Sequence, residues 1–221
     1  MRKITGAAFV SLDGVMQAPG GPSEDPTGGF SHGGWLAPIF DEAVGKRIDR
    51  LFGGDFDLLL GRRTYDIFAA YWPFAPDEEK AIRDPFNRAT KFVVTGGNQP
   101  LAWQNSERVG GLDALAAVKR TPGRDLVIQG SSTLYPQLLA AGLLDELVLM
   151  IFPLVLGAGK RLLGDGTPPA SMRVVEQEVT AAGTIIATYA PAGAVATGSF
   201  PSPDRSPAEV ERQERIAQGR W

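Results

Sequence analysis

The sequence predicts an α/β protein built on a largely parallel central sheet. Four short runs are almost wholly apolar and do not alternate with polar residues, as parallel strands covered on both faces do. These runs are residues 57–60, 91–95, 125–129 and 146–152. Helical patterns separate them, and this alternation favours a sheet with helices packed on its faces.

The remaining elements follow in order along the chain. Residues 3–12 predict a first strand, and residues 38–53 predict a helix whose apolar side chains recur on one face. That apolar set is Ile39, Phe40, Ala43, Val44, Ile48, Leu51 and Phe52. Shorter helices are predicted over 64–72, 111–119 and 132–142. Two runs flanking the tetrapeptide TAAG, 173–179 and 184–190, predict a closing antiparallel hairpin.

The composition changes after residue 190, which predicts a folded domain over 1–190 and an appendage over 191–221. Residues 191–205 are rich in Ala, Gly, Pro and Ser and indicate a linker. Ser206 followed by Pro207 predicts the start of a short polar helix. The appendage is interpreted as a disordered or loosely docked extension, with a functional arm as the alternative.

Bulk composition excludes several classes of function. The chain has 221 residues, a formal net charge of −3 and no run of basic residues, which argues against a nucleic-acid partner. It has no cysteine and one histidine, so no metal site is expected. No stretch approaches the ~20 apolar residues of a membrane-spanning helix, and Asp13 interrupts the first apolar run before it reaches signal-peptide length. We expect a soluble protein without a membrane partner, in the cytoplasm.

The stretch LLLGRRTY is the first candidate for a ligand site. A strand leaves through Gly61 and is followed at once by Arg62, Arg63 and Thr64. In a parallel sheet, ligands bind beyond the carboxyl ends of the strands, where helix N-termini attract anions. We expect Thr64 to cap the helix and the two arginines to reach a phosphate. The alternative is an ordinary turn with solvated arginines.

Two further strand ends show the same pattern. VIQGSSTL again runs from a strand through glycine into a helix, and its small or hydroxylic side chains suit a diphosphate cradled by backbone N–H groups. The residues of that turn are Gly130, Ser131, Ser132 and Thr133. FVVTGG places Thr95 and Gly96 where an adenosine would lie. Neither a Walker motif nor GxGxxG is present, and a plain helix cap is the alternative for the GSST turn.

The order of these motifs resembles the dihydrofolate-reductase-like family. SLDGV, LLLGRRTY, FVVTGG, VIQGSSTL and GLLDELVLMIFPLVLGAGKRLL, with the closing hairpin, are most similar to the C-terminal reductase domain of the bifunctional riboflavin-biosynthesis deaminase–reductase and its stand-alone relatives. The resemblance covers nearly all of residues 1–190. It implies a three-layer reductase fold, NADPH as cofactor and a homodimer.

The resemblance also implies roles for individual residues. Cofactor phosphates would lie against Gly61, Arg62, Arg63 and Thr64, with an arginine favouring the 2′-phosphate. Thr95 and Gly96 would border the adenosine, and residues Gly130 to Leu134 would surround the diphosphate and approach the nicotinamide. The sequence departs from true dihydrofolate reductases, because the LPW loop is absent, so dihydrofolate is not the expected substrate. It also lacks the zinc-deaminase signature, so only a reductase module is expected.

The substrate side must come from the long segment between Asp13 and Trp35 and from the later GAGKRLL stretch. Asp13 and His32 are the candidate catalytic acids, because each is placed to protonate a substrate as hydride arrives. Asp13 is also a candidate for binding a ring amide or ribityl hydroxyl. Trp35 is a candidate for stacking on a heterocycle, as are Tyr71 and Trp72. Lys160 is a candidate anion contact.

Each of these substrate-side residues has a structural alternative. Asp13 also suits an Asp-Gly turn, and His32 also suits an exposed loop. The aromatic residues also suit the core or an interface, and Lys160 also suits solvent. The long segment itself fits either a functional lid or a disordered loop.

The sequence therefore predicts an NADPH-dependent reductase that transfers hydride to a small polar heterocycle or carbonyl compound, with Asp13, His32 or water as the proton source. The alternatives are a nucleotide-binding module or sensor without turnover, a dimeric interaction protein that keeps the fold, and a reductase of antibiotics or other foreign carbonyl and nitro compounds.

Overall fold

The computed structural model describes residues 1–200 and 206–220. Eight strands form one sheet in the order β4-β3-β2-β5-β1-β6-β8-β7. The strands are β1 Ile4–Ser11, β2 Phe56–Gly61, β3 Lys91–Val94, β4 Ser106–Val109, β5 Asp125–Gln129, β6 Glu146–Phe152, β7 Met172–Val179 and β8 Ile185–Pro191. All pairings from β4 to β6 are parallel, and β8 pairs antiparallel with both β6 and β7. The predicted parallel sheet with a closing hairpin is confirmed.

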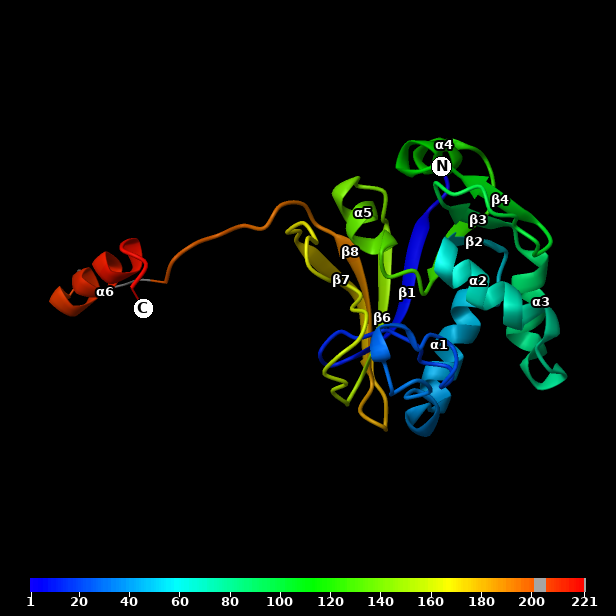
Figure 1. Cartoon of the computed structure of the whole chain (residues 1–221), viewed down its shortest axis with the longest axis horizontal. Helices are drawn as coiled ribbons and strands as arrows, with labels where there is room; N and C mark the ends of the chain where they lie inside the picture. Colours follow the sequence, from blue (N-terminus) through cyan, green and yellow to red (C-terminus); the bar gives the residue numbers. More distant parts are fainter. Residues whose placement is uncertain (201–205, 221) are drawn as a thin grey trace.

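Helices cover both faces of the sheet, which gives three layers (Figure 1). The helices of the domain are α1 Glu42–Phe52, α2 Arg62–Tyr71, α3 Lys80–Arg88, α4 Leu112–Arg120 and α5 Leu134–Ala140. Buried side chains of α1, α2 and α3 join one core cluster, and those of α4 and α5 join the other. The carboxyl ends of the parallel strands therefore meet helix N-termini along one edge, which is where ligands bind in such sheets.

Strand β2 shows why apolar residues do not alternate with polar ones in the strands of this sheet. Leu58, Leu59 and Leu60 are all 0% exposed. Successive strand residues point to opposite faces, and accordingly Leu58 and Leu60 join the cluster under α1–α3 while Leu59 joins the cluster under α4 and α5. A strand between two helical layers thus needs apolar side chains at every position.

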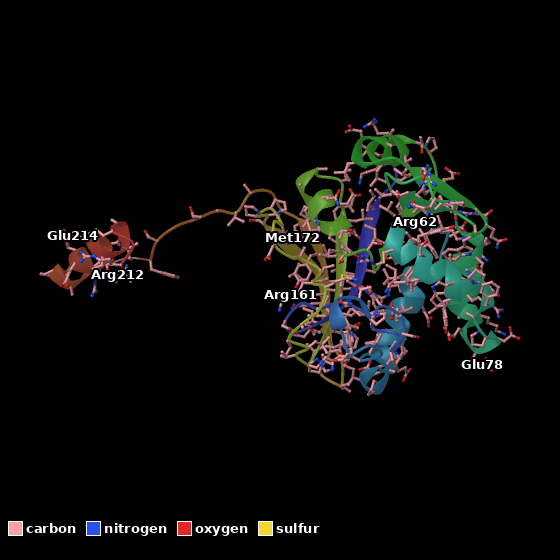
Figure 2. The ribbon with its side chains drawn as sticks, viewed as in Figure 1. Arg62, Glu78, Arg161, Met172, Arg212 and Glu214 are labelled. Atoms are coloured by element: carbon pink, nitrogen blue, oxygen red, sulfur yellow. The ribbon has the colours of Figure 1, made fainter. Side chains whose placement is uncertain are left out.

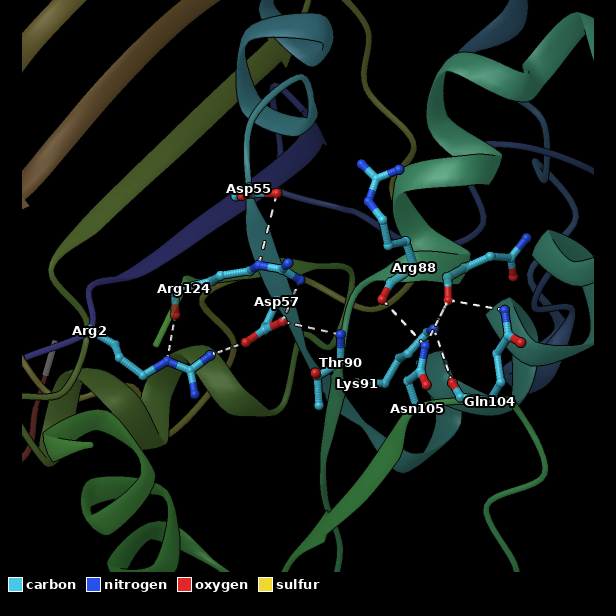
Figure 3. Close-up of polar contacts among 10 residues, drawn as sticks. Arg2, Asp55, Asp57, Arg88, Thr90, Lys91, Gln104, Asn105 and Arg124 are labelled. Atoms are coloured by element: carbon cyan, nitrogen blue, oxygen red, sulfur yellow. Dashed lines mark hydrogen bonds and ion pairs between the residues drawn. The ribbon is translucent and has the colours of Figure 1, made fainter. Parts of the chain in front are cut away.

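Charged groups tie together the strands at the amino-end edge of the sheet, opposite the predicted site (Figure 3). Arg2 and Asp57, both nearly buried, form an ion pair, and Arg2 Nε donates to the Arg124 carbonyl at 2.5 Å. The other oxygen of Asp57 accepts from the N–H of Thr90 at 3.1 Å. These bonds satisfy a buried charge pair that would otherwise be costly, and they fix β1, β2 and β5 to the segment that enters β3.

Lys91, at the start of β3, is 0% exposed and has no carboxylate within salt-bridge distance in the described residues. Its Nζ donates to the carbonyls of Asn87 at 2.8 Å and Gln104 at 3.1 Å, and lies 4.2 Å from the centre of the Trp103 ring. Burial lowers the pKa of Lys91 to about 8, because an apolar environment disfavours the charged form.

Strand β4 and helix α3 were absent from the sequence prediction, and helix α1 is shorter than predicted. Strand β4 is an edge strand whose sequence SERV is mostly polar, so no apolar run marks it. Helix α3 carries Pro85 in its interior and buries only Phe86, so few apolar side chains and an internal proline obscure it in the sequence. Helix α1 begins only at Glu42, because Asp41 caps it by accepting from the N–H of Val44 at 2.9 Å.

Helix α6 Pro207–Ala217 lies apart from the sheet at the end of the appendage (Figure 1). Ser206 Oγ accepts from the N–H of Glu209, so the predicted helix start is confirmed. Part of the predicted linker, 201–205, lies outside the described residues. Within the described chain no helix is long and apolar enough to cross a membrane.

Candidate cofactor and substrate site

Strand β5 ends earlier than its neighbours at the carboxyl edge of the sheet. It pairs with β1 only as far as Gln129 opposite Ala7, whereas β1 continues beside β6 to Ser11. It pairs with β2 only as far as Val127 opposite Leu58, whereas β2 continues to Gly61. Residues 8–11 of β1 and 59–61 of β2 therefore have no β5 residue paired between them. We call this gap in strand pairing, which begins after Gln129, the notch.

Two turns beside the notch are joined by a reciprocal pair of hydrogen bonds. The N–H of Gly61, after β2, donates to Ser131 Oγ at 2.9 Å, and the N–H of Ser131, after β5, donates to Thr64 Oγ1 at 2.9 Å. We call this pair the clasp. It explains why hydroxyl side chains occur in both motifs. The expectation that Thr64 caps its own helix was wrong: α2 begins at Arg62, has no side-chain cap, and its third residue bonds the opposite turn.

The clasp demands an unusual backbone at Gly130 and Ser131. Gly130 has φ +73°, and a Cβ there would lie 2.8 Å from Cγ2 of Thr64. Ser131 has φ +59°, a left-handed conformation that L-residues adopt at a cost. Glycine is therefore required where the two turns approach each other, and Ser131 is held in place by its two hydrogen bonds.

The two adjacent arginines of α2 have different environments. Arg62 forms an ion pair with Asp66, in which Nη2 of Arg62 lies 2.8 Å from Oδ1 of Asp66. Nη1 of Arg62 donates to the carbonyls of Gln99 at 3.1 Å and Pro100 at 3.2 Å. Arg63 is exposed and makes no hydrogen bond or ion pair within the described part of the chain. The expectation of two equally available arginines is thus corrected, because Arg62 holds the loop after β3 and Arg63 alone is unengaged.

Arg108 on β4 is a residue that the sequence analysis missed. Its Nη2 donates to the carbonyl of Gln99 at 2.5 Å and its Nη1 donates to that of Gly97. Arg62 and Arg108 therefore converge on one carbonyl and brace the loop that follows Thr95 and Gly96. The Thr95 N–H donates to Val109 O at 3.0 Å, and Gly96 is exposed beside the loop.

The remaining residues of the second turn lie at the start of α5. Ser131 is buried, Ser132 is half-buried and Thr133 is exposed. Leu134, by contrast, is 3% exposed, and its N–H is already bonded to Ser131 O at 2.9 Å. The structure thus brings Gly61, Thr64, Gly130 and Ser131 together and leaves Leu134 inside the core.

Asp13 braces two loops at the ends of β1 and β6. Its carboxylate accepts from Ser11 Oγ at 2.6 Å and from the N–H groups of Leu156 at 3.0 Å and Gly157 at 2.9 Å. These bonds, the one from Ser11 foremost, lower the pKa of Asp13 to about 2, because they stabilise the charged form. A carboxylate that stays ionised at neutral pH does not donate a proton, which argues against the acid role considered for Asp13.

Part of the long segment after β1 packs into the protein core. Trp35 is 8% exposed, donates from Nε1 to the carbonyl of Gln17 at 2.9 Å, and packs edge-on against Phe152. The stacking role expected for Trp35 is corrected, because its ring is covered by the protein's own side chains. Trp72 likewise packs against the core, whereas Tyr71 is 46% exposed and donates to Glu79 at 2.5 Å.

Lys160 lies in the same assembly of loops. Its Nζ pairs with Asp25 and donates to Thr27 Oγ1 at 2.7 Å. The backbone N–H of Lys160 donates to Gln17 Oε1 at 2.9 Å. The anion contact expected for Lys160 is corrected, because a carboxylate of the same chain already neutralises it. This partner, distant in sequence, gave no signal in the linear pattern.

His32 is exposed and contacts the edge of the Phe30 ring, with ring centres 5.9 Å apart. Figure 2 shows that Arg62 at the start of α2 and Arg161 on the side of β6 to β8 lie on different parts of the domain. Arg161 donates from Nε to Asp13 O at 2.9 Å. Among the described residues no cluster of three or more His, Cys, Asp or Glu side chains is placed to hold a metal ion.

Comparison with known proteins gives relatives along nearly the whole domain. Residues 2–186 match the RibD C-terminal domain family. A Bacillus subtilis (strain 168) protein, the uncharacterized protein YyaP, is 25% identical over 198 residues, which is 85% of this chain and 94% of that protein. This match agrees with the resemblance that the motifs indicated.

Solved structures show the same fold. A putative riboflavin biosynthesis protein from Shewanella sp. PV-4 has a TM-score of 0.64 and 22% identity over 86% of this chain and 99% of its own. A pyrimidine reductase-like protein from Corynebacterium diphtheriae has a TM-score of 0.53 and 15% identity, with 86% and 92% covered. Dihydrofolate reductase from Enterococcus faecalis, solved with NADP(H) and RAB-propyl, has a TM-score of 0.53 and 14% identity, with 86% and 96% covered. The fold is dihydrofolate-reductase-like, and the chain belongs to the RibD C-terminal domain family.

Proposed function

We propose that this protein is an NADPH-dependent reductase of a small polar heterocycle or carbonyl compound. One observation carries the proposal: the clasped turns of β2 and β5 meet beside the notch, with an unengaged arginine, Arg63, at the exposed start of α2. The family, whose solved neighbours include proteins named as reductases, supports an oxidoreductase.

The residues present fit a dinucleotide phosphate. The N–H groups in the first turn of a helix have no intrahelical acceptor. Helix α2 also begins without a side-chain cap, so its first turn favours an anion. Arg63 adds a guanidinium that no carboxylate of the described chain neutralises. The hydroxyls of Thr64 and Ser131 are engaged with each other's turns, so we assign them to positioning the phosphate site rather than to binding.

Nicotinamide supplies the hydride when the cofactor is bound. The chain's own residues would hold the phosphates at α2, orient the ring toward the notch, and exclude water through the packed loops around Gln17 and Trp35. Because Asp13 stays ionised, we assign proton delivery to His32 or to solvent. The acceptor would enter beside the ends of β1 and β6.

A reductase activity assay tests this proposal. Purified protein is mixed with NADPH and a panel of flat heterocycles and carbonyl compounds, and the loss of absorbance at the reduced nicotinamide is followed. Turnover of any acceptor that depends on the protein supports the proposal. The H32A variant then separates the two proton sources, because its rate falls if His32 delivers the proton and stays unchanged if solvent does.

A second candidate, a nucleotide-binding module without turnover, is favoured by one observation: neither Asp13 nor His32 is a buried acid aimed at the notch. That reading predicts tight NADPH binding with no oxidation in the presence of any acceptor. Binding and turnover measured on one preparation distinguish the two candidates.

We also propose that the protein is a homodimer and that strand β7 forms part of the interface between the two copies. This strand is last in the sheet order, and its residues after Met172 are all exposed, including Val174 at 51%, Val175 at 48% and Val179 at 69%. An exposed edge strand with apolar side chains is normally covered. Light scattering should give twice the chain mass, and V175E should shift the protein toward monomer. A monomeric wild type would contradict this assignment.

A further inference from the structure

Three aliphatic side chains of the closing hairpin are left exposed on one face of the sheet. Val174, Val179 and Ile185 are 51%, 69% and 39% exposed. Val174 pairs with Tyr189, which packs against the core cluster under α4 and α5. Ile185 lies four residues before Tyr189 on the same strand and pairs with Val179. By the alternation of strand residues, all three lie on the α4 and α5 side of the sheet. We call them the uncovered face.

The other side of the same strands is fully covered. Met150 on β6 and Ile186 on β8 belong to the cluster under α1, α2 and α3, and they are 0% and 2% exposed. An apolar sheet face normally packs against another element, and exposed apolar side chains that adjoin one another mark an interaction site. The uncovered face therefore needs an element to pack against it.

Helix α6 is a helix that lacks a packing surface. It has 11 residues, and isolated helices shorter than about 12–15 residues are marginal in water. Figure 1 shows it apart from the sheet, and none of its side chains belongs to a core cluster of the described residues. Val210, Ile216 and Ala217 fall within about a third of the helix circumference. They give α6 a narrow apolar stripe.

The appendage leaves the domain beside strand β7. The N–H of Ser171 donates to the carbonyl of Gly193 at 2.8 Å, and its Oγ donates to that of Ala194 at 2.9 Å. The chain is thus held at the start of β7 as far as Ala194. The residues between Ala194 and Ser206 can span at most about 40 Å, whereas β7 is about 27 Å long. The appendage can therefore carry α6 across an interface that includes β7.

The composition of the appendage favours a protein surface as the partner of α6. Residues 206–220 contain three Glu and three Arg, so they carry no net charge that would attract an anionic lipid surface or a nucleic acid. A short apolar stripe on a helix suits a groove or face of a protein. Within one chain α6 lies away from the uncovered face (Figure 1), so we assign a second copy as the occupant.

We propose that α6 of each copy packs its apolar stripe against the uncovered face of the other copy, as an exchanged arm. This inference rests on the homodimer of the proposed function. In a two-fold dimer the exchange is reciprocal, so both uncovered faces are covered at once. The arm adds a helix where α4 and α5 leave the hairpin of the partner exposed. The family match ends at residue 186, so the arm is an addition to the fold shared with the relatives.

Cross-linking between engineered cysteines tests the placement of α6. The chain has no cysteine, so an introduced thiol is the only one present. V210C and I185C are made in separate chains of different size, mixed to exchange subunits and oxidised. A disulfide between the two different chains is expected. R215C, on the opposite side of α6, is the matched control and should give little cross-link with I185C. A double V210C/I185C variant reports a disulfide within one chain.

Light scattering at a series of concentrations measures the contribution of α6 to the dimer. The V210D/I216D variant should raise the Kd of the dimer at least about tenfold, because two aliphatic side chains are no longer buried. E211A/R215A, on the other side of the helix, should leave that Kd unchanged. Amide exchange should become faster along β7 in V210D/I216D and stay unchanged along β4, the other edge strand of the sheet.

The possible failures can be told apart. A dimeric wild type that gives no cross-link from V210C to I185C, that cross-links only within the double variant's own chain, or that keeps its dimer Kd in V210D/I216D would overturn the exchanged arm and leave the homodimer standing. A monomeric wild type would overturn the homodimer and the arm together. The NADPH titration reports on the reductase separately, because the arm contains none of the residues assigned to the cofactor.

Discussion

The amide nitrogen of Ser131 lies 2.9 Å from Oγ1 of Thr64, although 67 residues separate them in the chain. With the return bond from Gly61 to Ser131 Oγ, the contact joins the turns after β2 and β5 into one unit. The backbone around the proposed phosphate site is thus preorganised before a ligand arrives, which reduces the entropy lost on binding.

Removing the hydroxyl of Thr64 should loosen this unit. T64V keeps the shape of the side chain but leaves the N–H of Ser131 without its acceptor, and we expect a loss of about 1–3 kcal/mol in the free energy of unfolding. The Kd for NADPH should rise as well. Urea unfolding and calorimetry measure the two effects. T64S, which keeps the hydroxyl, serves as the control; a T64V variant indistinguishable from T64S would contradict the account.

Gly130 should not tolerate a side chain. G130A places a Cβ at φ +73° and 2.8 Å from Cγ2 of Thr64, so the variant should lose at least about 1 kcal/mol of stability from the left-handed backbone alone. G96A is the matched control, because nothing lies within 4 Å of a Cβ at Gly96 and its φ is not positive. Thermal unfolding of both variants decides; equal midpoints would count against the clasp geometry.

Arg62 and Arg63 should have separable roles. R63A should weaken NADPH by about 10- to 100-fold and leave NADH nearly unchanged, because a charge-assisted bond to the 2′-phosphate is lost. R62A removes the contacts to Asp66, Gln99 and Pro100, so it should weaken both cofactors alike and loosen the loop after β3. Titration of each variant with both nucleotides provides the test. An R63A variant that loses affinity for NADPH and NADH equally would contradict the assignment of the 2′-phosphate to Arg63.

Lys91 should make stability depend on alkaline pH. Its pKa falls from an ordinary 10.5 to about 8 in the folded state, so above pH 8 the unfolded chain binds more protons than the folded chain. The free energy of unfolding due to this group therefore rises from pH 8 toward pH 10.5 and is lost as pH falls through 8. In K91M this rise should be absent.

Urea titrations of wild type and K91M between pH 7.5 and 9.5 measure the difference. The upper limit keeps Tyr71 out of the window, since its hydrogen bond to Glu79 raises its pKa to about 12. Parallel pH profiles for the two proteins would show that Lys91 does not titrate as its burial implies.

Sequence pattern predicted the fold well because most of its elements are apolar and local. The strands of the double-covered sheet show as apolar runs such as DLLL, and the closing hairpin shows as two strand-like runs that flank the tetrapeptide TAAG. Strand β4 and helix α3 were missed for a physical reason. The polar SERV edge strand depends on pairing with β3, and α3 depends on packing Phe86 against aromatic rings from distant elements.

The site was predictable only in part. Glycine followed by basic or hydroxyl residues marked the two turns, since a strand-to-helix turn with exposed N–H groups depends on local sequence. Which charges are free is a tertiary property: Lys160 is paired with Asp25, 135 residues away, and Arg62 is engaged by carbonyls of a later loop.

The most direct measurement is a parallel calorimetric titration of the wild-type protein with NADPH, NADH and ATP. We expect tight binding of NADPH, binding of NADH that is at least tenfold weaker, and still weaker binding of ATP, because only NADPH combines a 2′-phosphate for Arg63 with a nicotinamide for the notch. Failure to bind NADPH, or equal affinity for NADPH and NADH, would contradict the assignment of an NADPH site to this protein.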